Sequence, residues 1–424
     1  MAIRVDSEIG RLRRVLVHNP GLEIDWMVPS MMADLLFDDI LYGKQARAEH
    51  AAFCAVIRSA GVETLEARDL LREVLEVPEH HAEMIARLSA RAAPEAAEQL
   101  AGMDAAALAS AALTGLRNPQ GYQSTETSLY RLRPVPNYFF QRDPQFVLGE
   151  LVVVAAMATA ARHREPLLAA TIFRHHPALA GYSALFAIGD EMPTPGHPMG
   201  GDQPSLEGGD VILADHQTLL VGLSERSNMR GVERLAEYLR GHETPFRHLI
   251  VVDLPSRRSY MHLDTIFTIV DEGQCLAYLP VIQPQRRLSA QAFYVDLGAR
   301  ELSFSLRPSL LDALKRIGID LEPIPCGAGD DVLDQAREQW TDGANAFALA
   351  PGVILLYRRN RRTIDELARR GWRVVEQEEV VAGRRAVLGE GPTVVTIPGN
   401  ELSRARGGPR CMTMPLEREP LAGS

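Results

Sequence analysis

Apolar side chains recur along the chain in short runs that alternate with amphipathic stretches. Five segments have the character of strands, and the last four of them consist of two apolar runs joined by a short turn segment with Gly, Asp or Pro, which is typical of β-hairpins. These segments are residues 13–19, 146–156, 210–223, 264–279 and 345–360.

Helical spacing of apolar residues follows most of the strand segments, at residues 228–241, 309–318 and 363–372. The repeated order of strands and then a helix predicts pseudo-repeats of one α/β module. Residues 68–131 depart from this order, because they are rich in Ala, Leu, Glu and Arg and contain few β-branched residues. We therefore expect an α/β domain of residues 1–67 and 132–424 and an all-helical insertion of residues 68–131. Shielding of the core is favoured over a regulatory role for this insertion.

Composition excludes several classes of protein. The 424 residues are 46% hydrophobic and 24% charged, which excludes disordered and fibrous chains. The net charge is −10, from 45 basic and 55 acidic residues, and this acidic balance argues against nucleic acid and anionic membranes as partners. The longest apolar run, residues 151–161, is too short to cross a bilayer, and the charged N-terminus does not resemble a secretory signal. We expect a cytoplasmic protein.

The cysteines lack metal-binding or redox spacing, which excludes zinc fingers, thioredoxin-like sites and a disulfide framework. Cys411 differs from the others because Arg404, Arg406 and Arg410 precede it around a Gly-Gly-Pro turn. Nearby cations stabilise a thiolate, so Cys411 is a candidate nucleophile, although arginines on a loop are equally consistent with a solvated surface. The remaining cysteines are interpreted as packing residues: Cys54, Cys275 and Cys326.

Polar clusters lie at the edges of the strand segments, at residues 136–144, 206–211, 260–265 and 404–413. His262 and Asp264 share one face of an extended segment, so a base and a carboxylate can converge there, although a structural histidine is the commoner explanation of such spacing. Several carboxylates near a thiolate would repel it unless the ligand is cationic, and a guanidinium group fits that requirement. The carboxylates are Asp143, Glu207, Asp210 and Asp264. Arg162 and Arg226 are either surface residues or partners for the carboxylate end of an amino acid.

Several motifs in one order resemble those of arginine deiminases: PNYFFQRDP, EGGDV, MHLDT, REQWTDGANAFALAPGVILLYRRN and ELSRARGGPRCMT. The match also includes VDSEIGRLRRVLVHNPGLE and LLFDD near the N-terminus, and the helical segment falls where that family carries a helical bundle. The resemblance implies a five-bladed α/β propeller (pentein fold) of ββαβ modules, in agreement with the five strand segments. It also implies hydrolysis of L-arginine to L-citrulline and ammonia.

The resemblance assigns a role to each matching residue. Cys411 attacks the guanidinium carbon to form a thiouronium intermediate, and His262 protonates the leaving ammonia and later acts as the base toward water. Asp143 and Asp264 bind guanidinium nitrogens, and Glu207 supports the guanidinium and His262. The expected substrate-binding residues are Asn137, Phe140, Arg162, Asp210, Arg226 and, on a closing loop, Arg406. No metal and no organic cofactor are implied, and we expect a homo-oligomer.

The chain departs from the usual family pattern at Met31, Gln141, Arg358, Pro409 and Arg410. Since Arg410 stands where the family has a histidine, we predict that activity depends less on an imidazole beside the nucleophile. The departures leave open a guanidino substrate other than free arginine, and they leave open amidino transfer in place of hydrolysis. A non-catalytic binding protein on the same fold is disfavoured, because a pure binder does not need Cys411.

Overall fold

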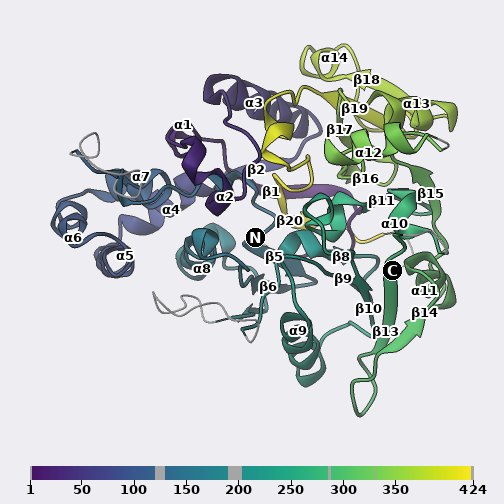
Figure 1. Ribbon diagram of the computed structural model, residues 1–424, viewed down its shortest axis with the longest axis horizontal. Helices are drawn as coiled ribbons and strands as arrows, with labels where there is room; N and C mark the ends of the chain where they lie inside the picture. Colours follow the sequence, from purple (N-terminus) through teal and green to yellow (C-terminus); the bar gives the residue numbers. More distant parts are fainter. Residues whose placement is uncertain (1, 120–128, 190–202, 285–287, 330, 422–424) are drawn as a thin grey trace.

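The structure, a computed structural model, describes residues 2–119, 129–189, 203–284, 288–329 and 331–421 (Figure 1). Helices and strands alternate along the chain, and the strands form six sheets. The expected α/β class is therefore confirmed. Among the described residues, no helix combines the length and the apolar character that a bilayer crossing requires.

Five of the six sheets share one strand order, in which an antiparallel pair is followed, after a helical crossover, by a third strand parallel to the second. Parallel neighbours require such a crossover because the chain must return to the same end of the sheet. The unit that shows this most simply comprises β5 (Gln145–Leu148), β6 (Leu151–Val154), α8 (Arg164–His175) and β7 (Ala184–Ala187).

Three further units follow in the chain. The second contains β8 (Val211–Leu213), β9 (Thr218–Leu223), α9 (Met229–Gly241) and β10 (His248–Asp253), and is widened by β13 (Gln291–Asp296) and β14 (Ser305–Arg307). The third contains β11 (Phe267–Asp271), β12 (Gln274–Ala277), α10 (Leu279–Ile282), α11 (Leu310–Arg316) and β15 (Glu322–Pro325). The fourth contains α12 (Val332–Trp340), β16 (Phe347–Ala350), β17 (Val353–Tyr357), α13 (Arg361–Arg369), β18 (Arg373–Glu376), α14 (Gln377–Val381) and β19 (Thr393–Ile397).

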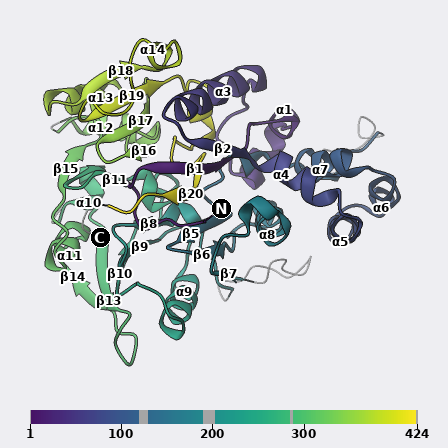
Figure 2. The ribbon, with the colours of Figure 1, turned by 180° about the vertical axis from the view of Figure 1, so that it is seen from behind.

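The fifth unit joins the two ends of the chain. β20 (Met414–Arg418) pairs antiparallel with β1 (Leu12–Val17), and β1 pairs parallel with β2 (Glu63–Glu66) after α3 (Gly43–Ser59). Figure 2 shows β1 in purple beside β20 in yellow. The short helices α1 (Leu22–Asp25) and α2 (Met32–Leu35) lie between β1 and α3. Five ββαβ-like units are thus present, and their closure into a five-bladed propeller remains a prediction.

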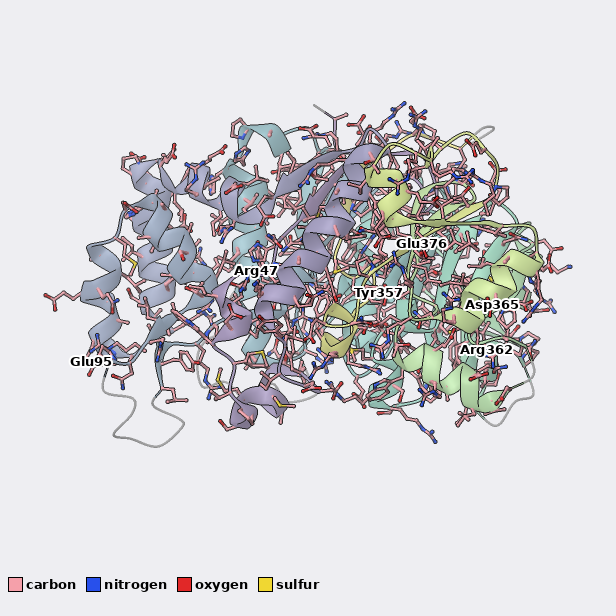
Figure 3. All side chains as sticks on the ribbon, turned by 90° about the horizontal axis from the view of Figure 1, so that it is seen from above. Arg47, Glu95, Tyr357, Arg362, Asp365 and Glu376 are labelled. Atoms are coloured by element: carbon pink, nitrogen blue, oxygen red, sulfur yellow. The ribbon has the colours of Figure 1, made fainter. Side chains whose placement is uncertain are left out.

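A group of helices lies to one side of the sheets in Figures 1 and 2. In Figure 3, Glu95 marks the far end of this group, and Asp365 of α13 lies toward the opposite end of the molecule. Leu71, Leu88 and Leu108 belong to the same hydrophobic cluster as Val152 of β6, so the group packs against the sheets. It comprises α4 (Ala67–Leu75), α5 (Pro78–Ser89), α6 (Pro94–Ala101), α7 (Ala105–Thr114) and the small sheet of β3 (Leu116–Arg117) and β4 (Tyr130–Leu132).

The described part of residues 68–131 is mainly helical, but the expectation of an all-helical insertion is wrong, because β3 and the start of β4 lie inside this segment and pair with each other. Residues 120–128 lie outside the described residues. The proposed domain boundaries and the shielding role remain predictions.

All five segments expected to be strands contain strands, and the four expected hairpins are antiparallel pairs. Asn228 and Ser309 accept a backbone N–H at the starts of α9 and α11, as N-caps. The third strand of each unit was not anticipated. β2, β7 and β15 have four residues each and β15 contains two prolines, so these three carry a weak strand signal. β10 and β19 have apolar, β-branched runs, and their strand signal was missed.

Candidate functional site

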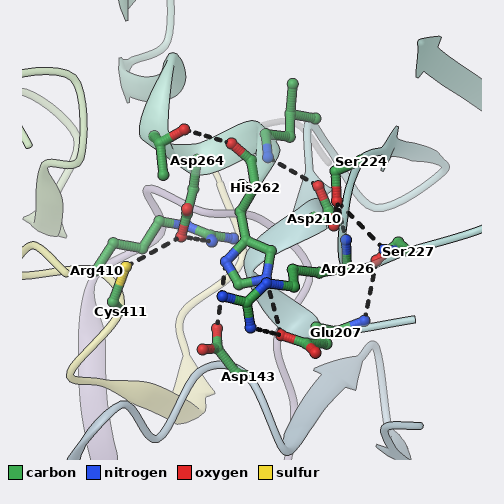
Figure 4. A network of polar contacts seen from close by, with 12 residues as sticks. Asp143, Glu207, Asp210, Ser224, Arg226, Ser227, His262, Asp264, Arg410 and Cys411 are labelled. Carbon is green, nitrogen blue, oxygen red and sulfur yellow. Dashed lines mark hydrogen bonds and ion pairs between the residues drawn. The ribbon is translucent and has the colours of Figure 1, made fainter. Parts of the chain in front are cut away.

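The site is built from the segments that precede the first strand of each unit. Asp143 comes before β5, Glu207 before β8, His262 and Asp264 before β11, and Cys411 before β20. Because the five units share one strand order, these segments occupy equivalent positions in the chain. Figure 4 shows that four of the five units contribute predicted catalytic side chains to one network.

Cys411 is buried, with 4% of its surface exposed. Its thiol donates to Oδ2 of Asp264 across 3.7 Å, and Sγ accepts a hydrogen bond from Nδ2 of Asn345 at 3.2 Å. Burial raises the pKa of the Cys411 thiol well above its ordinary value, and the negative charges of Asp264, Asp143 and Asp342 raise it further. The side chain is therefore a neutral thiol at neutral pH in this structure.

Two of the arginines that precede Cys411 point to other groups. Nε of Arg404 donates to Oδ2 of Asp39 at 3.0 Å. The guanidinium of Arg406 lies 3.4 Å from the centre of the Trp340 ring, a cation–π contact, and donates to the Trp340 carbonyl at 2.9 Å.

The third arginine, Arg410, connects two carboxylates and is almost completely buried. Nε and Nη2 donate to Glu8 at 3.1 and 2.9 Å, and Nη1 donates to Oδ2 of Asp264 at 2.8 Å. The adjacent guanidinium holds the pKa of Glu8 at about 2 despite its burial. The expectation that the arginines favour a thiolate is thus wrong for this structure, because their charges are used by carboxylates and an aromatic ring while the pKa of Cys411 is raised.

His262 is held as an imidazolium. Its Nε2 lies 3.0 Å from Oε2 of Glu207, and its Nδ1 lies 3.8 Å from Oδ1 of Asp143. Although burial alone would lower it, the carboxylates Asp143, Glu207 and Asp210 together raise the pKa of His262 to about 9. Gly209 makes this geometry possible, since a Cβ there would come within 2.4 Å of Nδ1 of His262. A protonated imidazole beside the thiol can serve as a general acid.

Asp143 and Asp264 each have one occupied and one free oxygen. Oδ2 of Asp143 accepts from Nη1 of Arg162 at 2.8 Å, as Oδ2 of Asp264 does from Arg410. The other oxygens, Asp143 Oδ1 and Asp264 Oδ1, are buried and have no hydrogen-bond partner among the described residues. A buried acceptor without a hydrogen-bond partner costs free energy, so a ligand with N–H donors would be stabilised by these two carboxylates beside Cys411.

Arg162 is surrounded by carboxylates. Its Nε and Nη2 donate to Glu165 at 2.9 and 2.7 Å, and its Nη1 also lies 3.4 Å from Oε2 of Glu207. These charges raise the pKa of Arg162 well above its ordinary value. Arg226 differs, because its Nη1 is buried without a hydrogen bond to the described residues, 3.8 Å from Glu207. Arg226 thus has a donor to spare for an anionic group, as does Arg406, whose Nε is also buried without a hydrogen bond to the described residues.

The remaining predicted binding residues have structural contacts. Asp210 accepts from the backbone N–H of Leu263 at 2.8 Å and from the Ser224 hydroxyl at 2.6 Å, and it does not line the cavity beside Cys411. Asp210 therefore supports the segment between His262 and Asp264, and its contact with a substrate remains a prediction. Asn137 and Phe140 do line that cavity.

The cavity has a volume of about 20 Å³. This is enough for about one water molecule, so lining side chains must move before an amino acid can bind. Leu36 and Arg406, which both line the cavity, have positive φ angles of 64° and 65°, a backbone region that side chains other than glycine rarely adopt. The complete lining is Leu36, Asn137, Phe140, Asp143, Arg162, Arg226, Met261, His262, Thr265, Ala405, Arg406, Gly407 and Cys411.

One cluster in the described residues resembles a cation site, since ligand atoms of Asp143, Glu207 and His262 lie within 4.8 Å of one another. Arg162 donates to Asp143, and His262 is itself positively charged at neutral pH. These positive charges oppose a metal ion in the same space, so the donor set does not fit one.

Most departures from the family pattern lie away from the thiol. Gln141 donates to the Tyr138 carbonyl at 2.6 Å, Met31 packs in a hydrophobic cluster, and Arg358 pairs with Glu378. Arg410 alone among them contacts a predicted catalytic group.

Sequence reasoning missed Asn345 and Glu8. Asn345 precedes β16, the first strand of the fourth unit, so it holds the position that the other units fill with site residues. That repeat position was a usable signal. Glu8 precedes β1 and carries no comparable local signal, because its partner Arg410 lies at the other end of the chain.

Comparison with solved structures identifies the fold. An amidinotransferase from Microseira wollei, in the saxitoxin biosynthetic pathway, aligns with a TM-score of 0.53 at 14% identity, covering 100% of this chain and 99% of that chain. The N-terminal domain of ArgZ, an arginine dihydrolase from the ornithine–ammonia cycle in cyanobacteria, aligns with a TM-score of 0.51 at 14% identity, covering 96% and 97%. The protein thus has the α/β fold of these two structures.

Comparison of sequences identifies the family. The family described as arginine deiminase matches residues 33–418. The arginine deiminase of Clostridium perfringens is 35% identical over 445 residues, 99% of each chain, and that of Listeria monocytogenes is 34% identical over 437 residues, 99% of this chain and 98% of the relative. The chain belongs to the arginine deiminase family.

Proposed function

We propose that the protein hydrolyses L-arginine to L-citrulline and ammonia through a covalent intermediate on Cys411. The observation that carries the proposal is the pair of oxygens without a hydrogen-bond partner, Asp143 Oδ1 and Asp264 Oδ1, on two of the three carboxylates whose charges raise the pKa of the thiol. A guanidinium supplies several N–H donors in one plane together with the positive charge that two buried carboxylates require.

Binding requires rearrangement within the cavity. Nη1 of Arg162 occupies Asp143, so the substrate guanidinium takes over this contact while Glu165 retains Nε and Nη2 of Arg162. The spare donor of Arg226 is suited to the substrate carboxylate. Asn137 and Phe140 line the same cavity, and movement of the segment around Arg406 would admit the amino acid.

The substrate itself activates the nucleophile. The carboxylates that raise the pKa of Cys411 become neutralised when a guanidinium lies between them, so the thiol loses its proton more readily with substrate bound. Because His262 is already protonated, the thiol proton passes to water, and the thiolate then attacks the guanidinium carbon. This order favours cationic substrates, because a neutral ligand would leave the carboxylate charges uncompensated.

His262 accounts for the proton transfers. The imidazolium donates its proton to the departing nitrogen as the C–N bond breaks, which releases ammonia and leaves an S–C bond in a thiouronium cation. The neutral imidazole next accepts a proton from water while the water oxygen bonds to the same carbon. The S–C bond then breaks as the hydroxyl proton returns to the sulfur, which gives citrulline and the neutral thiol. Glu207, at 3.0 Å, stabilises the charged form of His262 at both ends of the cycle.

Turnover and adduct formation test the proposal. The protein is incubated with L-arginine, citrulline and ammonia are measured, and Cys411 is examined by mass spectrometry. We expect equal amounts of both products, an adduct on Cys411, and loss of turnover in Cys411→Ala. Cys275→Ala is the matched control, because Cys275 is buried in β12 outside the site.

Unchanged turnover in Cys411→Ala would overturn the mechanism. An adduct without citrulline would contradict hydrolysis and indicate amidino transfer or another guanidino substrate. Binding of arginine with neither adduct nor product would indicate a non-catalytic protein. The cytoplasmic location and the homo-oligomer remain predictions.

A further inference from the structure

Asn345 is completely buried, and both ends of its side-chain amide are used by the nucleophile segment. Oδ1 accepts the backbone N–H groups of Arg410 at 3.0 Å and Cys411 at 3.3 Å. Nδ2 donates to the backbone carbonyl of Asp264 at 3.1 Å and to Sγ of Cys411 at 3.2 Å.

The partners determine which way the amide faces. Backbone N–H groups only donate, and a backbone carbonyl only accepts. If Oδ1 and Nδ2 of Asn345 were exchanged, its NH2 group would face the two backbone N–H groups and its oxygen would face the Asp264 carbonyl, and all three hydrogen bonds would be lost. Gly408 packs against the same amide, since a Cβ there would lie 2.5 Å from Oδ1. An N–H group of Asn345 is therefore directed at the sulfur by its surroundings.

The charges around Sγ of Cys411 increase the importance of the N–H group of Asn345. Three carboxylates oppose a negative charge on Cys411: Asp264, Asp143 and Asp342. Arg410, the residue before Cys411, directs its guanidinium to Glu8 and Asp264. Among the described side chains, Asn345 is the one whose N–H group forms a hydrogen bond to Sγ. A hydrogen bond to the charged form of a group favours that form.

We propose that Asn345 is a further catalytic residue, which donates a hydrogen bond to the Cys411 thiolate during attack and fixes the sulfur between the segments before β11 and β20. The inference rests on the proposed function, because it concerns the same nucleophile. Asn345 also completes the repeat pattern, since it gives the fourth unit a residue at the site.

The test measures the acidity of the thiol without any guanidino substrate. The rate of Cys411 alkylation by iodoacetamide is followed by mass spectrometry across pH in the full chain and in Asn345→Asp and Asn345→Ala. We expect the pH at which the alkylation rate reaches half of its maximum, the alkylation midpoint, to rise by about one pH unit or more in Asn345→Ala. It should rise further in Asn345→Asp, because the new side chain faces the sulfur with a negative charge instead of an N–H donor.

Asn360→Asp is the matched control. Asn360 is an equally buried asparagine that bonds to Thr341, in the loop that leads to Asn345, and its hydrogen bonds go to Thr341 and not to Cys411. We expect its alkylation midpoint to match that of the unchanged protein. Circular dichroism identifies variants that fold, and Asn345→Ala keeps the test decisive if Asn345→Asp does not.

Arginine turnover provides a second measurement. Because Asn345 does not line the cavity, kcat should fall by about 10²–10³, as for removal of one hydrogen-bond donor to a reacting atom, with little change in KM. Equal alkylation midpoints in folded Asn345→Ala and the unchanged protein would overturn the inference. Absence of arginine turnover in the unchanged protein would instead overturn the proposed function, and the alkylation result would stand separately.

Discussion

Arg410 was expected to stabilise a thiolate on Cys411, but its guanidinium contacts two carboxylates instead. Its guanidinium lies between Glu8 and Asp264 and donates to both. Asp264 thereby has one oxygen occupied and the other without a hydrogen-bond partner, while the thiol remains neutral. Breaking a buried pair of this kind leaves an uncompensated charge, which costs about 3–5 kcal/mol. Arg410 therefore connects the nucleophile segment to Asp264, the carboxylate that is proposed to bind the substrate.

We predict that the pH dependence of kcat/KM has no step from residue 410, because the pKa of Arg410 lies above its already high ordinary value under the influence of Glu8 and Asp264. Arg410→His places a group that titrates between pH 5 and 8 in the same position and should add a step in that range. The measurement is kcat/KM from about pH 5 to pH 9 for both proteins. Identical profiles in the two folded proteins would contradict the prediction.

At the scale of elements, each predicted catalytic side chain lies just before the first strand of a unit, where the backbone leaves a short turn and enters a sheet. The crossover helix α9 contacts one of these turns through its N-cap. Asn228, the N-cap of α9, accepts from the N–H of Gly231 at 3.0 Å and also from the N–H of Ser205 at 3.1 Å, two residues before Glu207. One cap thus connects a helix to the segment that bears the partner of His262.

Asn228→Ala should lower stability by about 1 kcal/mol through loss of the cap, and should also lower kcat because the Glu207 segment is released. Ser309→Ala is the control, since Ser309 caps α11 at 3.1 Å and has no contact with the site segments among its described hydrogen bonds. Urea unfolding and arginine turnover are measured for both. Equal effects of the two substitutions on kcat would show that the cap does not support Glu207.

At the scale of the whole molecule, charged groups far from solvent make stability depend on pH. Buried His18 bonds to Glu66 at 2.7 Å and to Glu23 at 3.1 Å, and these carboxylates raise its pKa to about 9 against the opposing effect of burial. The contact joins the end of β1 to α1 and β2. At the acidic side, neighbouring cations hold the pKa values of Glu8 and Glu207 at about 2.

The contributions of His18 and Glu8 to stability should therefore both be complete between about pH 4.5 and 6.5. The folded pKa of His18 is above its unfolded value of 6.5, so its contribution is complete below 6.5 and is lost as pH rises through about 9. The folded pKa of Glu8 is below its unfolded value of 4.5, so its contribution is complete above 4.5 and is lost as pH falls toward 2. Each change amounts to a few kcal/mol, at about 1.4 kcal/mol per pKa unit.

Urea unfolding across this range measures the effect. His18→Gln should flatten the decline on the alkaline side, and the remaining slope belongs to His262, whose pKa is also about 9. A free energy of unfolding that stays constant from pH 6.5 to 9 in the unchanged protein would contradict the assignment.

Much of the architecture could be predicted from local patterns. The hairpins β5–β6, β8–β9, β11–β12 and β16–β17 carry alternating apolar runs around turns, and α9 and α11 begin at polar caps. The short third strands β2, β7 and β15 could not be predicted, because each gains its stability from a neighbour brought alongside by a crossover, whereas β10 and β19 do carry a local strand pattern. The placement of β1 beside β20 joins opposite ends of the chain and leaves no local trace.

The amino-acid sequence by itself determined the kinds of element, their order, and the residue types that carry the chemistry, including Cys411, His262 and the carboxylates. These properties depend on neighbours along the chain, through periodicity, caps and motif order. Only the tertiary structure decided that Arg410 is directed to Glu8 and Asp264, that two carboxylate oxygens remain without partners, and that Asn345 faces the sulfur. Side-chain direction, burial and electric field arise from segments that meet only when the five units pack together.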